Sequence, residues 1–223
     1  DLNANGTLFM NESTAADVVF AVYSGLCGSL VDVACTDGEP SSVALTSGTT
    51  YYIAVGMKSA TAEPSVPLVL SFELVSPPAN DTCGTAASLV LPSGSLTSDA
   101  RVALNDPDIT CNSSAASGAV AGVWYRINSG VDAGSFIVSE TSANDVVLVL
   151  YSGSCGSLST PIFCSDGESN VTAQLSPNTD YYLLVSQWGA SSPTAPFAIN
   201  YSFNAVSGAC CNACLLYTSD AAD

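Results

Sequence analysis

The sequence predicts an all-β protein: two tandem antiparallel β-sandwich domains of the jelly-roll or immunoglobulin-like kind, the first lacking its N-terminal strands. Three observations lead to this prediction. Blocks of sequence occur twice, strand-like runs are dense, and no amphipathic helix longer than about two turns can be found.

The chain contains the same pattern twice, at an offset of about 128 residues. Residues 17–25 (DVVFAVYSG) return as 145–153 (DVVLVLYSG), and residues 27–30 (CGSL) return unchanged as 155–158. Two further blocks repeat as well: 35–39 with 164–168, and 50–55 with 180–185. Because this period is too long for a solenoid unit, it indicates a duplicated domain.

The expected strands are runs of β-branched and aromatic residues separated by Gly, Pro, Ser and Asp. In the first repeat they are 18–23, 42–45, 50–55 and 68–75. In the second repeat they are 123–127, 135–139, 146–151, 171–175, 181–185 and 197–203. Short strands at roughly ten-residue spacing are typical of an antiparallel sandwich.

The domain boundaries follow from the repeat and from a proline-rich linker at 76–80 (SPPAN). We expect one sandwich at 1–76 and a complete one at 77–206. The second repeat has about 50 residues before Val131 that have no counterpart in the first. The missing half either lies upstream in the gene or is supplied by a neighbouring chain through strand addition.

The C-terminal residues fall into two further segments. Residues 207–213 read as the start of a truncated Cys-rich segment. Residues 214–223 read as the translation of a sequencing adapter, with an ordinary short terminal strand as the alternative.

Composition excludes several classes of function. Three basic and 20 acidic residues give a net charge of -17, which disfavours nucleic acid and anionic lipid as partners. The absence of histidine excludes Ser-His-Asp and Cys-His catalysis and His-containing zinc sites within this sequence. Because these catalytic groups are missing, we expect no enzymatic activity. No apolar run is long enough for membrane insertion as a helix.

The cysteines predict disulfides and an oxidising compartment. Two pairs bracket the same Gly-Ser-Leu turn in each repeat, and we expect each to close a hairpin: Cys27 with Cys35, and Cys155 with Cys164. Cys83 and Cys111 occur only in the part unique to the second repeat and are expected to pair with each other. Metal thiolates, the alternative, would need closer clustering of cysteines.

Six Asn-x-Ser/Thr sequons, about twice the number expected by chance, predict N-linked glycans if exposed in a secreted protein. They begin at Asn5, Asn11, Asn80, Asn112, Asn170 and Asn200. Asn80 in the linker and Asn112 beside a cysteine are the strongest candidates, whereas Asn200 lies in an expected strand and must face solvent.

Several of these motifs in combination resemble the bacterial pre-peptidase C-terminal domain. They are residues 79–83 (ANDTC), 122–126 (GVWYR), 145–151, 155–158 and 181–182 (YY). That family is a small secreted β-sandwich, often in tandem. The resemblance implies an accessory, adhesive or structural role without catalysis, and some members of the family bind calcium.

Two candidate ligand sites remain. Asp37, Glu39, Asp166 and Glu168 occupy matched acidic loops that could hold calcium, the one possible cofactor, or could be solvated turn residues. Trp188 follows an expected strand and is the more plausible exposed ring for ligand stacking, whereas Trp124 is expected in the core. The counterpart of Trp188 in the first repeat is Met57 or Lys58, which weakens any shared binding role.

These observations favour an extracellular, cell-surface structural glycoprotein that is the repeating subunit of a filament or surface assembly. Its partner would be the protein itself, in a head-to-tail contact that includes completion of the first sandwich by a neighbour. The alternative is an accessory carbohydrate- or protein-binding module of a larger secreted protein.

Overall fold

The computed structural model describes residues 5–13, 17–37, 41–59, 67–104, 120–166, 170–189 and 193–206. The segments expected at 207–213 and 214–223 lie outside these ranges. The same is true of Cys111, Asn112, Glu39 and Glu168.

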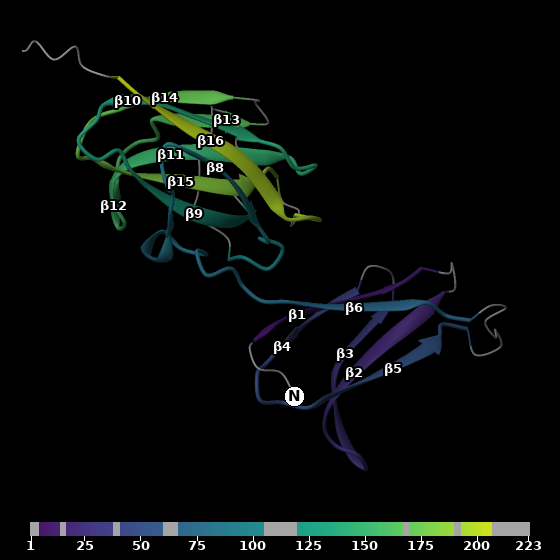
Figure 1. Ribbon diagram of the computed structural model, residues 1–223. Coiled ribbons are helices and arrows are strands. Elements are labelled where there is room, and N and C mark those ends of the chain that lie inside the picture. The colour runs from purple at the N-terminus through teal and green to yellow at the C-terminus, as the bar shows by residue number, and fades with distance from the viewer. Residues whose placement is uncertain are drawn as a thin grey trace, which may run out of the picture.

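The first sandwich consists of two three-stranded antiparallel sheets (Figure 1). Its strands are β1 (Gly6–Glu12), β2 (Val18–Leu26), β3 (Ser29–Asp37), β4 (Ser41–Leu45), β5 (Tyr51–Met57) and β6 (Leu70–Val75). One sheet has the order β4-β1-β6 and the other β3-β2-β5. Every second residue is buried along β1 and along the first five residues of β2, so the apolar faces of the two sheets enclose a small core.

The second sandwich is larger and contains the short 3-10 helix η1 (Cys83–Thr85). Its strands are β7 (Ala87–Ser88), β8 (Ser93–Ser98), β9 (Val120–Asn128), β10 (Gly134–Glu140), β11 (Val146–Ser154), β12 (Ser157–Leu158), β13 (Phe163–Asp166), β14 (Val171–Leu175), β15 (Asp180–Gln187) and β16 (Phe197–Ala205). One sheet has the order β14-β10-β16-β8 and the other β12-β11-β15-β9-β7, with β13 also paired to β11. All pairs are antiparallel except β7 with β9. The predicted fold class is confirmed.

Strand registers show that the two sandwiches share the same strand pairing. Gly6 of β1 lies opposite Leu45 of β4, as Gly134 of β10 lies opposite Leu175 of β14. A hydrogen bond after these strands also recurs. The Thr46 N–H donates to the Tyr51 hydroxyl at 3.0 Å, and the Ser176 N–H donates to the Tyr181 hydroxyl at 2.8 Å.

Three strands of the second sandwich, β7, β8 and β9, have no counterpart among the described residues of the first. β8 pairs with β16 and β9 pairs with β15, whereas the matching strands β6 and β5 each pair on one side only in the described part of the chain. The segment that carries β8 and β9 lies before β10, where the sequence of the second repeat is longer. Among the described residues, both sheets of the first sandwich thus have fewer strands than their counterparts in the second.

The predicted disulfide pairings are wrong. Cys83 bonds to Cys155, with their Cα atoms 5.6 Å apart, rather than to Cys111. Cys164 is disulfide-bonded, and not to Cys155. Cys27 and Cys35 are free and exposed.

Hairpin geometry explains these errors. Cys155 lies in the turn after β11, whereas Cys164 of β13 lies opposite Val149. Six residues of strand, about 20 Å, separate Val149 from the turn. Cys35 lies opposite Ala21, at the same distance from Cys27. A disulfide needs Cα atoms within about 7 Å, so neither pair can close its hairpin.

In the part of the chain that the structure describes, η1 is the only helix, and none is long and apolar enough to cross a membrane.

Candidate functional site on the outer face of the second sandwich

The sheet that contains β9, β15 and β11 has two very different faces. Val123, Tyr125 and Ile127 of β9 point into the main core, where they pack with residues of both sheets. Because side chains alternate along a strand, Trp124, Arg126 and Asn128 lie on the outer face. The candidate site is built from this outer face.

An aromatic cluster occupies the middle of the outer face. Trp124 is only 5% exposed and packs with Val147, Val149 and Leu184, so its expected burial is confirmed. The Trp124 and Tyr151 rings are 5.9 Å apart between centroids. Partly buried Tyr182 and Trp188 extend the cluster toward solvent. The result is an apolar platform, and beside it the Tyr182 and Trp188 rings remain partly accessible.

The segment around η1 covers one side of this cluster. The Trp124 N–H donates to the Asn80 carbonyl at 2.8 Å, and Asn80 Nδ2 donates to the Trp124 carbonyl at 3.0 Å. Cys83 and Ala86 pack against the cluster. The segment is thus tied to β9 at one end and, through Cys83–Cys155, to the β11 hairpin at the other.

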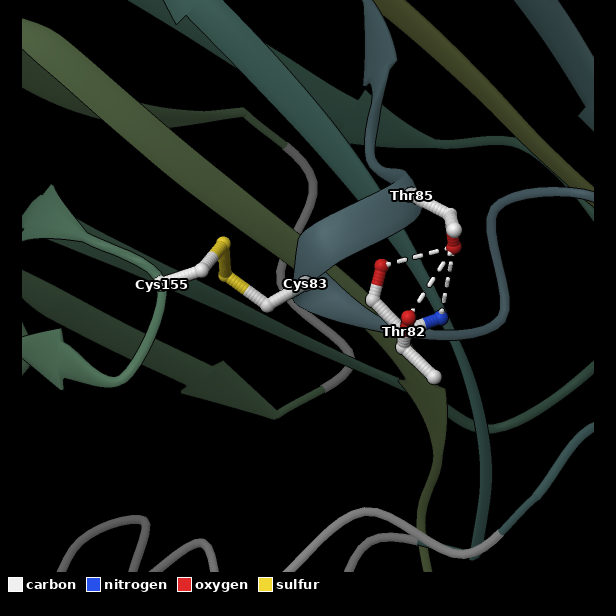
Figure 2. The surroundings of a disulfide bond; sticks show 4 residues. All are labelled: Thr82, Cys83, Thr85 and Cys155. Atoms are coloured by element: carbon white, nitrogen blue, oxygen red, sulfur yellow. Dashed lines mark hydrogen bonds between the residues drawn. A yellow bond between two sulfur atoms is a disulfide. The ribbon is translucent and has the colours of Figure 1, made fainter.

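Hydrogen bonds between two threonines give η1 its shape (Figure 2). The Thr82 N–H donates to the Thr85 hydroxyl at 3.3 Å, and the two hydroxyls are 3.0 Å apart. This reciprocal cap satisfies donors at the start of the helix. It presents Cys83 toward Cys155, as Figure 2 shows.

A polar network lies at the end of the outer face beside Tyr182. Arg126 Nε and Nη2 donate to the two oxygens of Asp180 at 3.2 and 2.7 Å, and Asn128 Nδ2 donates to Oδ1 of the same carboxylate at 2.7 Å. These bonds, from Arg126 first and then Asn128, lower the pKa of Asp180, so the carboxylate stays charged. Tyr182 lies directly opposite Arg126 in the register.

This arrangement suits the recognition of a small polar ring. An aromatic ring offers flat apolar area, and the guanidinium, carboxylate and amide offer fixed donors and acceptors for hydroxyl groups. The side chains of Arg126 and Asp180 are 45% and 32% exposed, so a ligand can reach them.

Trp188, the residue expected to stack on a ligand, lies at the other end of β15. Its N–H donates to the Asp145 carbonyl at 2.7 Å, as the Lys58 N–H donates to Asp17 at 2.9 Å, so Lys58 is its counterpart. The Trp188 side chain is partly buried against the aromatic cluster. Its role in stacking stays a prediction.

Sequence reasoning missed Arg126, Asn128 and Asp180 as site residues. One signal was available, because the chain has only three basic residues. All three form ion pairs with carboxylates: Lys58 with Asp37 and Asp17, Arg101 with Glu73 and Asp99, and Arg126 with Asp180.

The calcium prediction is not tested by the structure. Within the described ranges no group of three or more potential metal ligands occurs. The Asp37 carboxylate lies 3.0 Å from Lys58 Nζ, and Asp166 ends β13, while the two glutamates lie outside those ranges.

The sequons differ in accessibility. Asn5, Asn11, Asn170 and Asn200 are exposed, and Asn112 lies outside the described residues. Asn80 needs a correction. It is 8% exposed, and its Nδ2, the atom that would carry a glycan, is bonded to the Trp124 carbonyl. The folded domain therefore cannot accommodate a glycan at Asn80.

The chain belongs to the galactose binding domain-like, T9SS-associated family, whose model matches residues 79–199, more than half of the chain. The matched range includes every residue of the outer-face site. The secreted-type β-sandwich implied by the pre-peptidase resemblance is thus supported at the level of the fold. The family and the Cys83–Cys155 disulfide indicate an extracellular or envelope location.

Solved structures with some similarity include PliG of Aeromonas hydrophila, a periplasmic inhibitor of g-type lysozyme. It is 14% identical, with 53% of this chain and 96% of that chain covered and a TM-score of 0.35. The CUB1-EGF-CUB2 region of human MASP-1/3 is 9% identical, with 91% of each chain covered and a TM-score of 0.28. No curated protein matches the sequence.

Proposed function

We propose that this chain is an accessory binding module of a secreted or cell-surface protein, and that its outer-face site binds a carbohydrate. The observation that carries the proposal is Tyr182 beside the network of Arg126, Asp180 and Asn128. The description of the family as galactose binding domain-like supports the same class of ligand.

The electrostatics favour a neutral sugar. The net charge of -17 repels anionic ligands, nucleic acid and anionic lipid surfaces. Asp180 already neutralises Arg126, so the network offers hydrogen bonds without a free positive charge. With no histidine in the sequence, the module binds its ligand and leaves catalysis to other proteins or domains.

The test is calorimetric titration of the chain with galactose and galactose-terminated oligosaccharides, with mannose-terminated ones for comparison. We expect saturable binding that Tyr182→Ala and Arg126→Gln each weaken at least tenfold. Tyr52→Ala is the matched control, because Tyr52 holds the same register position in the first sandwich, where no described strand supplies the arginine. Absence of saccharide binding, or equal binding by Tyr182→Ala, would overturn the proposal.

Trp188→Ala measures how far the site extends. Trp188 and Asp180 lie at opposite ends of β15, so one monosaccharide cannot contact both. A loss of affinity confined to longer oligosaccharides would place a second stacking position at Trp188.

A second candidate function is the structural one, a glycosylated repeating subunit that assembles head-to-tail with itself. The observation that favours it is the open edge on each sheet of the first sandwich, because such edges add strands from other chains. Electron microscopy of native material, with mass spectrometry to confirm the chain, tests it. Ordered filaments with a repeat of one two-sandwich unit support assembly, and isolated particles rule it out.

A further inference from the structure

The first sandwich exposes a strand edge that is buried in the second. β15 lies between β11 and β9, whereas among the described strands β5 pairs only with β2. The consequence is seen at matched positions, since Ile53 of β5 is 39% exposed and Leu183 of β15 is fully buried. The first sandwich therefore carries a core-type side chain at an open edge.

The other sheet shows the same difference. Phe72 and Leu74 of β6 are 47% and 40% exposed, while their counterparts Tyr201 and Phe203 of β16 are each 7% exposed. The residues that lead into β8 cover Tyr201, whose hydroxyl donates to the Val90 carbonyl at 3.0 Å. Both sheets of the first sandwich thus lack cover at the same relative place.

The cysteines also differ between the two sandwiches. Cys27 and Cys35 occupy the positions of Cys155 and Cys164 in the register. Cys155 and Cys164 are both in disulfides, whereas Cys27 and Cys35 are free and exposed. Cys35 also lines a hollow on the outer face of β2 and β3, together with Ala21, Tyr23, Asp32, Val33 and Ala34.

The second sandwich shows what covers this surface. Residues 79–128 contain β8, β9 and two cysteines, one of which, Cys83, anchors the segment over the outer face. In the first sandwich two open edges, an uncovered outer face and two free thiols coincide with the places that this segment fills. These three kinds of feature therefore point to a single missing partner.

We propose that the open surface of the first sandwich binds a donor segment with the pattern of residues 79–128. One of its strands adds antiparallel to β5 and another adds antiparallel to β6. Its two cysteines form disulfides with Cys27 and Cys35. This proposal is independent of carbohydrate binding by the second sandwich.

A second copy of residues 79–128 is not the donor. In this chain Val123, Tyr125 and Ile127 of that segment belong to the main core of the second sandwich, and Cys83 is bonded to Cys155. Releasing the segment would open the second sandwich in order to close the first. The donor is therefore a further segment of the same galactose binding domain-like kind.

Formation of each bond follows ordinary thiol oxidation. The Cys27 thiol and a donor thiol lose two protons and two electrons as their sulfur atoms join. The electrons reduce the disulfide of a thiol–disulfide oxidoreductase to a dithiol, as expected for folding in an oxidising compartment. The exposure of both thiols makes them accessible to such a catalyst.

Disulfide mapping of the protein purified from its native source tests the proposal. Free thiols are alkylated, the protein is digested without reduction, and linked peptides are sequenced by mass spectrometry. We expect Cys27 and Cys35 each linked to a cysteine of a segment outside residues 1–223. Alkylated Cys27 and Cys35, a bond between the two, or bonds to Cys210, Cys211 or Cys214 would overturn the proposal.

Hydrogen–deuterium exchange gives a second readout that does not depend on the thiols. In the isolated 223-residue chain, the amides of β5 and β6 that point away from β2 and β1 should exchange rapidly. In the native protein the same amides should be protected at least tenfold more strongly, while those of β15 and β16 serve as controls and do not change. Equal exchange of β5 in both samples would contradict strand addition.

Discussion

Arg101 of the second sandwich binds the carboxylate of Glu73 in the first through two hydrogen bonds of 2.7 and 2.8 Å. The same guanidinium binds Asp99 and lies 5.0 Å from the centre of the Phe9 ring. Arg101, Glu73 and Phe9, together with Pro193 and Thr194, line a cavity of about 270 Å³ between the sandwiches. Arg101 is thus the central residue of the contact between the two sandwiches.

Arg101→Gln should loosen the relative orientation of the two sandwiches. The variant removes the bidentate bond to Glu73 and the cation–π contact with Phe9. Because Arg101 is not part of the main core, the core of the second sandwich should stay intact. We expect a larger radius of gyration in small-angle scattering, with unchanged thermal stability of each sandwich. Lys58→Gln, which removes two ion pairs within the first sandwich, is the control. Identical scattering of Arg101→Gln and the parent protein would contradict this role.

The same contact should depend on pH. Hydrogen bonds from Arg101 are the largest cause that lowers the pKa of both Glu73 and Asp99 in the folded chain. A depressed carboxyl pKa stabilises the contact above the ordinary value of about 4, and this stabilisation is lost as the pH falls through the depressed values. Scattering recorded from pH 7 downward should therefore show expansion only below about pH 4. Expansion that begins near neutral pH would point to another group.

The Cys83–Cys155 disulfide should stabilise the second sandwich substantially. It joins residues separated by 72 positions, and loss of such a bond from a secreted domain costs about 2–5 kcal/mol. We expect urea unfolding of the Cys83→Ser, Cys155→Ser double variant to show a loss in this range. Cys27→Ser and Cys35→Ser in the isolated chain are the controls and should leave stability unchanged, because both thiols are free and exposed. A double variant as stable as the parent would be inconsistent with the role of the disulfide.

Tyr181 and its counterpart Tyr51 allow the effect of burial on one recurring hydrogen bond to be compared. Tyr181→Phe removes the hydroxyl that accepts from the Ser176 N–H and should cost about 0.5–1.5 kcal/mol. Tyr51→Phe removes the equivalent bond to Thr46 but should cost less, since Tyr181 is 4% exposed and Tyr51 lies nearer to solvent. Chemical denaturation of both variants checks the order, and a larger effect at Tyr51 would reverse this reasoning.

Features that depend on local pattern could be predicted from the sequence. The blocks at 17–25 and 145–153 placed β2 and β11 correctly, and the longer second repeat indicated the strands missing from the first. Alternation of apolar residues is a property of each strand by itself. The fold class therefore follows from sequence without knowledge of strand order.

Features that depend on register between distant strands could not be predicted. Arg126 and Asp180 are 54 residues apart and meet only because β9 pairs with β15 in one register. Cys83 reaches Cys155 through the chain path of η1, which crosses the outer face rather than following a hairpin. Proximity in sequence favoured Cys164 as the partner, but the length of β11 separates it from the turn.

A final matched pair tests the open edge of the first sandwich. Leu183→Ala in the buried strand β15 should cost about 2–5 kcal/mol, the usual range for a buried leucine. Ile53→Ala in β5 should cost about 1 kcal/mol or less in the isolated chain, because Ile53 is 39% exposed there and leaves little cavity. Hydrogen–deuterium exchange measures the two free energies of unfolding separately, when it is followed at amides that exchange only after complete unfolding of the sandwich to which they belong. In native protein that holds the donor segment, Ile53→Ala should approach the cost of Leu183→Ala. Equal costs already in the isolated chain would show that β5 is not an open edge.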